Sequence, residues 1–136
     1  MIGLVIVTHE QIGAELLKVA ARLRDDKPER KPKCKFVPIE MNINPDYLEE
    51  IISDAIKAMD DGRGVLVMTD MFGGTPSNIT LSFLKDRKVE VLAGVNLPLL
   101  LHALELIENS PEMTLEVLAD EVAQCGQESI KDGLGL

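Results

Sequence analysis

Residues 1–10 read MIGLVIVTHE and hold the junction between the first predicted strand and the first predicted helix. Its apolar run, Ile2–Val7, has the length and composition of a buried strand, and apolar residues then recur at helical spacing from about Gln11 to Arg24. His9 stands where the strand ends and the helix begins. In an open α/β sheet, the carboxyl ends of the strands hold ligands and reacting groups. The stretch therefore predicts an α/β fold with His9 at its functional edge.

The same alternation of strand and helix continues along the chain. Residues 64–69 are apolar throughout, which predicts a strand buried on both faces. Four strands that alternate with helices predict a doubly wound, mainly parallel sheet with helices on both faces. A strand order of 2-1-3-4 would place the first and third strands side by side. The predicted strands are residues 2–7, 35–39, 64–69 and 89–93, and the predicted helices begin at Gln11, Asn44, Thr75, Pro98 and Ser110.

Size and charge limit the class of protein. With 136 residues, 46% of them hydrophobic, the chain is expected to form one domain, residues 1–125, followed by a C-terminal tail, residues 126–136. The net charge of −9 argues against nucleic acid and anionic membranes as partners and favours a partner with a basic face. Cys34 and Cys125 lie far apart in the sequence and indicate reduced thiols. We expect a soluble cytoplasmic domain without direct membrane insertion.

A second junction between strand and loop ends in a carboxylate. Asp70 directly follows the third predicted strand, and in a sheet of order 2-1-3-4 it would face His9 across adjacent strand ends. A neutral imidazole is nucleophilic near neutral pH, and its phosphoramidate transfers readily. Asp70 would accept a hydrogen bond from one ring nitrogen, fix the tautomer and leave the other nitrogen to attack. The pair predicts a histidine that carries a phosphoryl group.

The segment FGGTP at residues 72–76 is the predicted phosphate-binding turn. Backbone N–H groups at a glycine turn and at the start of the following helix bind phosphate oxygens, and a threonine hydroxyl can add to them. The segment lacks the GK[ST] of a Walker loop, and the chain shows neither GxGxxG nor metal-ligand spacing, so we predict no nucleotide, cofactor or metal. The predicted phosphate-binding residues are Thr8, Gly73, Gly74 and Thr75.

Each of these signals has an ordinary structural alternative. Alone, His9 would be a helix cap or a surface residue, Asp70 a turn residue, and the glycine segment a tight turn. Only their combination favours a site. His102, in the apolar run LLLHAL, is expected on a helix surface or in an interface, with a metal or catalytic role as the alternative. Asn78 and Asn96 are expected to be helix or loop residues, with a place in the wall of the site as the alternative.

Three ordered blocks carry a family resemblance: IVTH at residues 6–9, TDMFGGTPSN at 69–78 and AGVNLPLL at 93–100. With these blocks the chain resembles the IIA component of the mannose family of the bacterial phosphoenolpyruvate-dependent sugar phosphotransferase system. The likeness spans residues 1 to about 125, nearly the whole chain. Any one block alone would be a weak signal, whereas three in order are specific.

The resemblance implies a phosphoryl relay. His9 would accept phosphate on Nε2 from the phosphocarrier protein HPr and pass it to a IIB protein or domain. Asp70 would bond to Nδ1, and the loop at Gly74 and Thr75 would surround the phosphate. The resemblance also implies a cytoplasmic homodimer whose subunits exchange a sheet strand, which would add an antiparallel strand at the dimer interface. No residues of this chain are assigned to that strand.

Glu10 departs from the family pattern, which has glycine after the histidine. A carboxylate in the first helical turn would suit the helix dipole. It would also occupy the anion site itself and repel an incoming phosphate, which makes Glu10 a modulating residue. The alternative is that Glu10 points to solvent, and both interpretations stay open.

Two other functions fit the same residues. A regulatory interaction module would control a partner through its phosphorylation state or its surface, with weak or no onward phosphotransfer, and Glu10 favours this alternative. The phosphotransfer subunit of dihydroxyacetone kinase is related, but GGTPSN at residues 73–78 is of the mannose kind. The sugar cannot be read from this chain, because specificity in such systems belongs to the membrane components.

Overall fold

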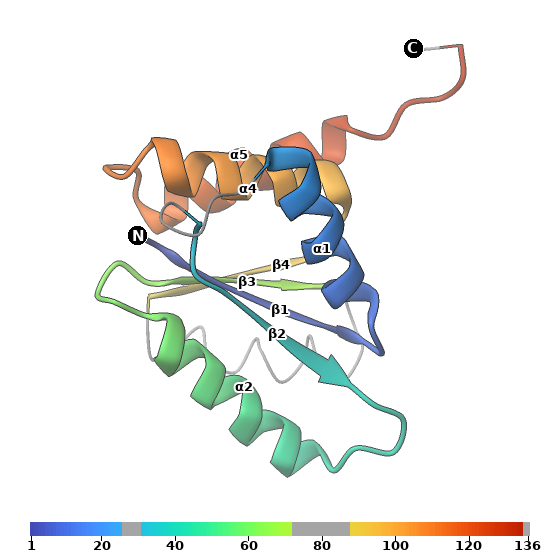
Figure 1. Cartoon of the computed structure of the whole chain (residues 1–136), viewed down its shortest axis with the longest axis vertical. Coiled ribbons are helices and arrows are strands. Elements are labelled where there is room, and N and C mark those ends of the chain that lie inside the picture. The colour runs from blue at the N-terminus through green and yellow to red at the C-terminus, as the bar shows by residue number, and fades with distance from the viewer. Residues whose placement is uncertain (26–30, 72–87, 135–136) are drawn as a thin grey trace.

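The computed structural model describes residues 1–25, 31–71 and 88–134. Figure 1 shows strands and helices alternating from β1 to β3, as the apolar pattern predicts, and two helices following β4. The helix predicted to begin at Thr75 lies outside the described residues. The described elements are β1 (Gly3–His9), α1 (Ile12–Arg24), β2 (Cys34–Ile39), α2 (Pro45–Met59), β3 (Val65–Thr69), β4 (Val89–Ala93), α4 (Leu97–Asn109) and α5 (Leu115–Glu128).

The four described strands form one parallel sheet in the order β2-β1-β3-β4, which confirms the predicted order. β1 lies between β2 and β3: His9 pairs with Ile39 on one side, and Val7 pairs with Thr69 on the other. Since the strands all point the same way, their carboxyl ends meet at one edge of the sheet. His9 and Asp70 therefore lie at the same edge, on neighbouring strand ends.

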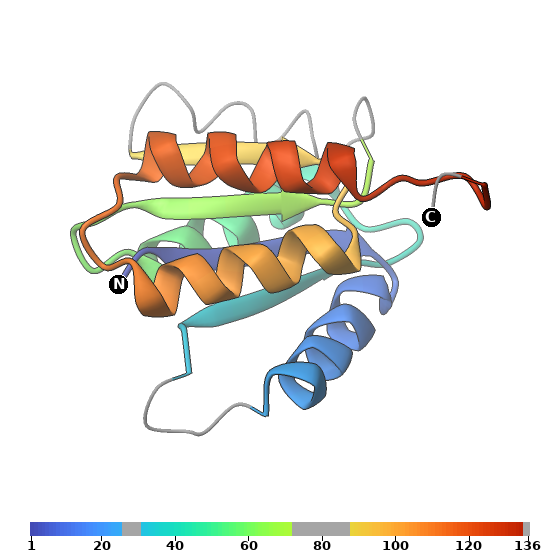
Figure 2. The same ribbon diagram turned by 90° about the horizontal axis from the view of Figure 1, so that it is seen from above.

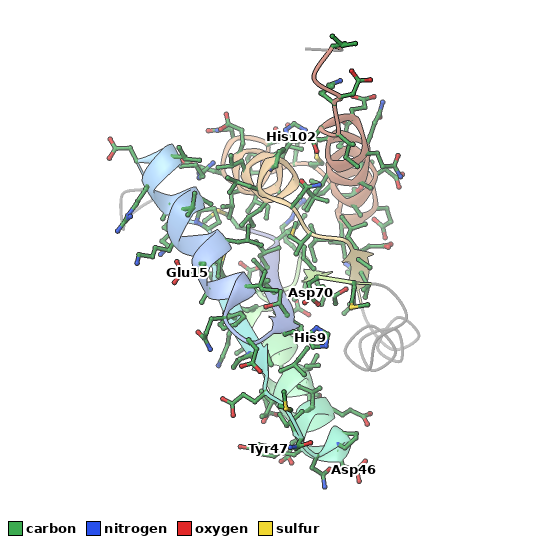
Figure 3. The ribbon with its side chains drawn as sticks, turned by 90° about the vertical axis from the view of Figure 1, so that its right-hand side faces the viewer. His9, Glu15, Asp46, Tyr47, Asp70 and His102 are labelled. Carbon is green, nitrogen blue, oxygen red and sulfur yellow. The ribbon has the colours of Figure 1, made fainter. Side chains whose placement is uncertain are left out.

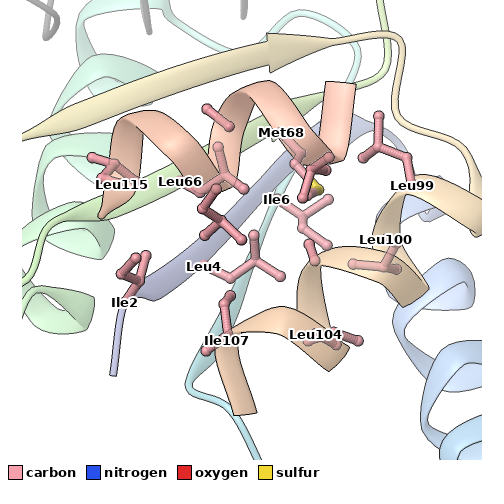
Figure 4. Close-up of a cluster of buried hydrophobic side chains, with 14 of the residues drawn as sticks. Ile2, Leu4, Ile6, Leu66, Met68, Leu99, Leu100, Leu104, Ile107 and Leu115 are labelled. Carbon is pink, nitrogen blue, oxygen red and sulfur yellow. The ribbon is translucent and has the colours of Figure 1, made fainter. Parts of the chain in front are cut away.

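Helices cover both faces of the sheet, as predicted. Figures 1 and 2 show α1, α4 and α5 on one face and α2 on the other. Successive side chains of a strand point to opposite faces, so β1 contributes to both layers. Leu4 and Ile6 pack in the cluster under α4 and α5 (Figure 4), whereas Val5 and Val7 pack against α2. Every residue of β3 is buried, which confirms burial on both faces.

Two helices begin with an asparagine cap. Asn44 caps α2, since its Oδ1 accepts hydrogen bonds from the backbone N–H groups of Asp46 (2.8 Å) and Tyr47 (3.4 Å). Asn96 caps α4 in the same way, through a hydrogen bond from the N–H of Leu99 (2.9 Å). A proline in the first turn of each helix reinforces the start, because its backbone has no N–H to satisfy.

The helix start predicted at Ser110 is wrong. α5 begins later, at Leu115, and its cap is Thr114, whose hydroxyl accepts a hydrogen bond from the N–H of Val117 (3.3 Å). Ser110 instead ends α4 and donates its backbone N–H to the carbonyl of Leu106 (2.9 Å). The Ser-Pro-Glu pattern has the composition of a helix start, but the backbone N–H of Ser110 is hydrogen-bonded to the end of the preceding helix.

α5 continues into the segment that the sequence assigns to the tail, because it ends at Glu128. Gly126 is buried in this last part of the helix, and a Cβ there would lie 2.6 Å from Cδ1 of Leu99. The missing side chain thus lets this last part of α5 pack closely on α4. The division of the chain into a domain and a tail stays a prediction.

Candidate functional site

The structure brings His9 and Asp70 together at the carboxyl edge of the sheet (Figure 3). Nδ1 of His9 lies 2.9 Å from Oδ2 of Asp70. The His9 side chain is 44% exposed, whereas that of Asp70 is only 14% exposed. A carboxylate accepts hydrogen bonds and does not donate them, so the bond assigns the ring proton to Nδ1. In that tautomer the lone pair of Nε2 is available for chemistry on a half-exposed ring.

The same carboxylate oxygen also holds the backbone of His9. The N–H of His9 donates to Oδ2 of Asp70 at 3.1 Å. Oδ1 of Asp70 is buried and finds no hydrogen-bond partner among the residues that the structure describes. Asp70 therefore restrains both the position of the His9 backbone and the orientation of its ring.

Glu10 follows His9 in a left-handed backbone conformation, with φ at +47°. Its N–H donates to the carbonyl of Ile39 (3.1 Å), which continues the pairing of β1 with β2, and its side chain is exposed. Glycine tolerates this conformation better than any other residue, which gives a physical reason for the glycine that the family resemblance expects here. The expectation that Glu10 lies in the first helical turn is wrong, because α1 begins at Ile12 with Gln11 as its N-cap.

Thr8 lies beside the site with its side chain fully buried. Its hydroxyl accepts a hydrogen bond from the N–H of Gly13 (2.8 Å) and donates to the carbonyl of His9 (3.3 Å). The predicted contact of Thr8 with phosphate stays a prediction. No local sequence pattern announces the bond to Gly13, because it joins a strand residue to a helix that must first pack on the sheet.

The other candidate residues lie elsewhere. Gly73, Gly74, Thr75 and Asn78 are outside the described residues. His102 is half-buried on α4, away from His9 (Figure 3), and lines a surface pocket together with α5 residues. Asn96, besides capping α4, donates from Nδ2 to the carbonyl of Gly126 (3.3 Å).

Within residues 1–25, 31–71 and 88–134, no group of three or more His, Cys, Asp or Glu side chains is arranged to hold a metal ion. None of the helices in these ranges has the length and apolar character needed to cross a bilayer.

Residues 3–122 match the family model EIIA-man, described as the PTS system fructose IIA component. The chain belongs to this family. PTS stands for the bacterial phosphoenolpyruvate-dependent sugar phosphotransferase system. The matched region begins at β1 and ends within α5, so it contains both His9 and Asp70.

Curated relatives and solved structures agree with the EIIA-man match. The chain is 33% identical over 132 residues to the mannose-specific EIIAB component of Escherichia coli K12, covering 96% of this chain and 40% of that protein. It is 36% identical over 85 residues to the fructose-specific EIIA component of Bacillus subtilis 168, covering 62% and 56%. The chain thus spans less than two thirds of the length of either relative.

A solved structure of the phosphotransferase system component EIIA from Streptococcus agalactiae superposes on the chain with a TM-score of 0.81. The superposition covers 97% of both chains at 23% sequence identity. At that level of identity the likeness shows the fold alone, and it agrees with the sheet order and the helical layers described above.

Proposed function

We propose that this chain is a phosphohistidine relay protein of a sugar phosphotransferase system, with His9 as the phosphate acceptor. The observation that carries the proposal is the hydrogen bond between Nδ1 of His9 and Oδ2 of Asp70 (2.9 Å) on a half-exposed ring. Membership of the EIIA-man family supports it. The donor is phospho-HPr, and the acceptor is a IIB protein or domain.

The proposed reaction exchanges one N–P bond for another. The lone pair of Nε2 attacks the phosphorus of the phosphohistidine of HPr, and the N–P bond of the donor breaks with its electron pair returning to the donor imidazole. His9 then carries the phosphoryl group on a cationic ring that keeps the Nδ1 proton. Asp70 offsets that charge and keeps the ring oriented, so no proton has to leave Nδ1 during transfer. Transfer to the IIB protein is the same exchange with the roles reversed.

The phosphoryl oxygens need donors that His9 and Asp70 do not supply. We assign this role to backbone N–H groups of Gly73, Gly74 and Thr75 and to the hydroxyl of Thr75, on the basis of the sequence. Such donors stabilise the charge on the phosphoryl oxygens during transfer without the help of a metal ion.

The partners follow from family and charge. A net charge of −9 suits docking to a basic surface around the donor histidine of HPr. We further infer a cytoplasmic homodimer, which the family resemblance implies. β4 is the last strand on its side of the described sheet, and the antiparallel strand expected from a second copy is not assigned to any residues.

The experiment incubates the purified chain with phosphoenolpyruvate, enzyme I and HPr, beside His9→Ala as the matched control. Acid-labile phosphate on the native chain and none on His9→Ala is the expected result. Addition of a IIB protein should then remove the label from His9. Absence of label on the native chain, with enzyme I and HPr shown to be active, would reject the relay.

The same experiment separates the relay from a regulatory interaction module. Glu10, exposed next to His9, is the observation that favours regulation, because its charge would slow the arrival of phosphate. A label that stays on His9 in the presence of IIB proteins, while the affinity for another partner changes, would support the module.

A further inference from the structure

Thr8 and Thr69 are the buried polar residues of the described part of the chain. Each directly precedes a residue of the site: Thr8 stands before His9, and Thr69 before Asp70. Burial of a hydroxyl is costly unless the hydroxyl is hydrogen-bonded. The hydrogen-bond partners of the Thr8 hydroxyl therefore indicate the structural role of this buried residue.

The Thr8 hydroxyl joins the end of β1 to the start of α1. Oγ1 accepts from the N–H of Gly13 (2.8 Å) and donates to the carbonyl of His9 (3.3 Å). Gln11, the N-cap residue of α1, makes no side-chain cap hydrogen bond. The first N–H groups of a helix have no partner within the helix, and Gly13 carries one of them. Thr8, a strand residue, supplies the acceptor that a cap residue ordinarily supplies.

Gly13 allows α1 to approach the sheet closely enough for this bond. A Cβ at residue 13 would lie 2.7 Å from the ring of Phe36 and 2.9 Å from Cγ2 of Ile6. Any side chain there would push the helix away from β1 and β2. We refer to the hydrogen-bonded pair of Thr8 and Gly13 as the Thr8–Gly13 clasp.

The clasp completes a set of anchors around His9. Asp70, after β3, holds the N–H and the ring of His9, and the carbonyl of Ile39 on β2 holds the N–H of Glu10. Thr8 holds the carbonyl of His9 and ties the loop to α1. A displacement of the loop would have to break bonds to three elements together, so the clasp resists a shift of His9 along its strand.

We propose that Thr8 is a positioning residue for the phosphoacceptor. Its hydroxyl keeps the His9 backbone in place, so that Nδ1 stays on Asp70 and Nε2 meets the phosphoryl group in line. The inference rests on the proposed phosphoryl transfer at His9. It assigns Thr8 a role through bonds inside the chain.

The test compares Thr8→Val, which keeps the branched shape but removes the hydroxyl, with Thr8→Ser, which keeps the hydroxyl. Ile107→Val is the control for a general loss of stability, because Ile107 packs beside Ile2 at the other end of β1 (Figure 4). The measurements are kcat and KM for phosphate transfer from phospho-HPr, the thermal midpoint, and the imidazole ¹⁵N NMR signals of His9 at a pH where the ring is neutral.

We expect Thr8→Val to lower kcat on the order of a hundredfold with little change in KM, because small misplacements of a nucleophile are costly. The population of the Nδ1–H tautomer of His9 should fall with it. Thr8→Ser should restore both the rate and the tautomer. Ile107→Val should lower only the thermal midpoint, since it leaves the anchors of His9 intact.

The proposal is overturned if Thr8→Val transfers phosphate at the native rate. It is also overturned if Ile107→Val, at the same drop in thermal midpoint, loses as much of the transfer rate as Thr8→Val does. If the native chain accepts no phosphate, the relay itself fails, and the NMR measurement still decides the role of Thr8. An unchanged Nδ1–H tautomer in Thr8→Val then overturns positioning. Should Thr8→Val not fold, Thr8→Cys, whose thiol is a weak acceptor, must show a partial loss of the tautomer, and a native tautomer there overturns the proposal.

Discussion

The chain passes from strand to helix after β1 and after β4, at the same edge of the sheet, and the two junctions are built differently. After β4, Gly94 adopts the left-handed conformation (φ +89°) and Asn96 caps α4. After β1, Glu10 adopts it (φ +47°), and α1 has no side-chain cap from Gln11. The junction after β4 therefore has glycine at its left-handed position and asparagine as its helix cap, the residue types that favour these positions. The junction after β1 has glutamate at its left-handed position and no side-chain cap.

The difference lies in where the stabilising groups come from. After β4, the left-handed residue and the cap belong to the junction itself, although the N–H of Gly94 also bonds to the carbonyl of Thr69 (2.9 Å). After β1, Thr8 supplies the acceptor for the helix start, Ile39 holds Glu10, and Asp70 holds His9. The junction after β4 is also bonded to β3 and α5, but its helix cap comes from its own Asn96. The junction that carries the proposed nucleophile instead takes its helix-start acceptor from the strand and is bonded to β2 and to the residue after β3, which suits a residue that must be placed accurately.

The largest effect should come from Asp70→Asn, which breaks the contact unique to the β1 junction. An amide can offer an N–H to Nδ1 and so favour the wrong tautomer of His9. We expect phosphate transfer from phospho-HPr to fall by about 10³-fold to 10⁴-fold, in line with the loss seen when an orienting carboxylate becomes an amide.

Asp46→Asn is the control for this experiment. It removes an exposed carboxylate at the first turn of α2, which Figure 3 places away from His9. The control should transfer phosphate at the native rate, and a thermal scan should show that both variants are folded at the temperature of the assay. A near-native rate for Asp70→Asn would remove Asp70 from the mechanism.

Asn96→Ala breaks the β4 junction and should spare the site. Loss of an asparagine cap lowers the free energy of unfolding by about 1 kcal/mol. Asn44→Ala, which removes the cap of α2, should cost less, because Asn96 also bonds to Gly126. Urea denaturation measures both losses. A slower phosphate transfer by folded Asn96→Ala would contradict the division between the two junctions.

Glu10→Gly makes the β1 junction resemble the β4 junction. Relief of the left-handed strain and the greater freedom of the unfolded chain nearly cancel, so stability should change by less than about 1 kcal/mol. We expect faster phosphorylation of His9, because a negative charge beside the arriving phosphate is removed.

Glu10→Gln separates charge from backbone, since it removes the charge and keeps the strain. Stopped-flow phosphorylation of both variants by phospho-HPr is the measurement. If neither variant is faster than the native chain, Glu10 points to solvent without consequence for the reaction.

The smallest effect is expected at Glu90 on β4. Burial, and then the charges of Glu116 and Asp120, raise the pKa of its carboxyl. The folded state therefore holds this proton more tightly than the unfolded state, and stability is lost as pH rises from the unfolded pKa through the folded one. Glu90→Gln should raise the thermal midpoint slightly at neutral pH and leave it unchanged in acid below the ordinary glutamate range. A gain of equal size at both pH values would contradict a titration effect.

Local patterns predicted the features that depend on neighbouring residues. The apolar run of β3 indicated burial on both faces, and Asn44 before a proline indicated the start of α2. The same kind of rule failed at Ser110, because the end of α4 competes for the same backbone groups. It also failed for the end of α5, where the helix continues to Glu128 and Gly126 packs against Leu99.

Some features of the site were likewise predicted from the sequence, and others were not. That His9 and Asp70 lie at one edge followed from strand alternation and the assumed strand order, and the structure brings the two side chains within hydrogen-bond distance. Their roles in transfer stay predictions until phosphorylation is measured. The second bond of Asp70, to the backbone of His9, had no sequence signal, and the left-handed conformation of residue 10 had one only in the glycine of the family pattern.

Periodicity and motif spacing are properties of the chain, so they were enough to predict the alternation of strands and helices, the edge at which His9 stands and the family. The hydrogen bond from Gly13 to Thr8, which completes the start of α1, and the one from Glu10 to Ile39 became known from the packed structure. Those hydrogen bonds form once α1 has packed on the sheet and β2 lies beside β1, so they depend on distances between elements that no local pattern encodes.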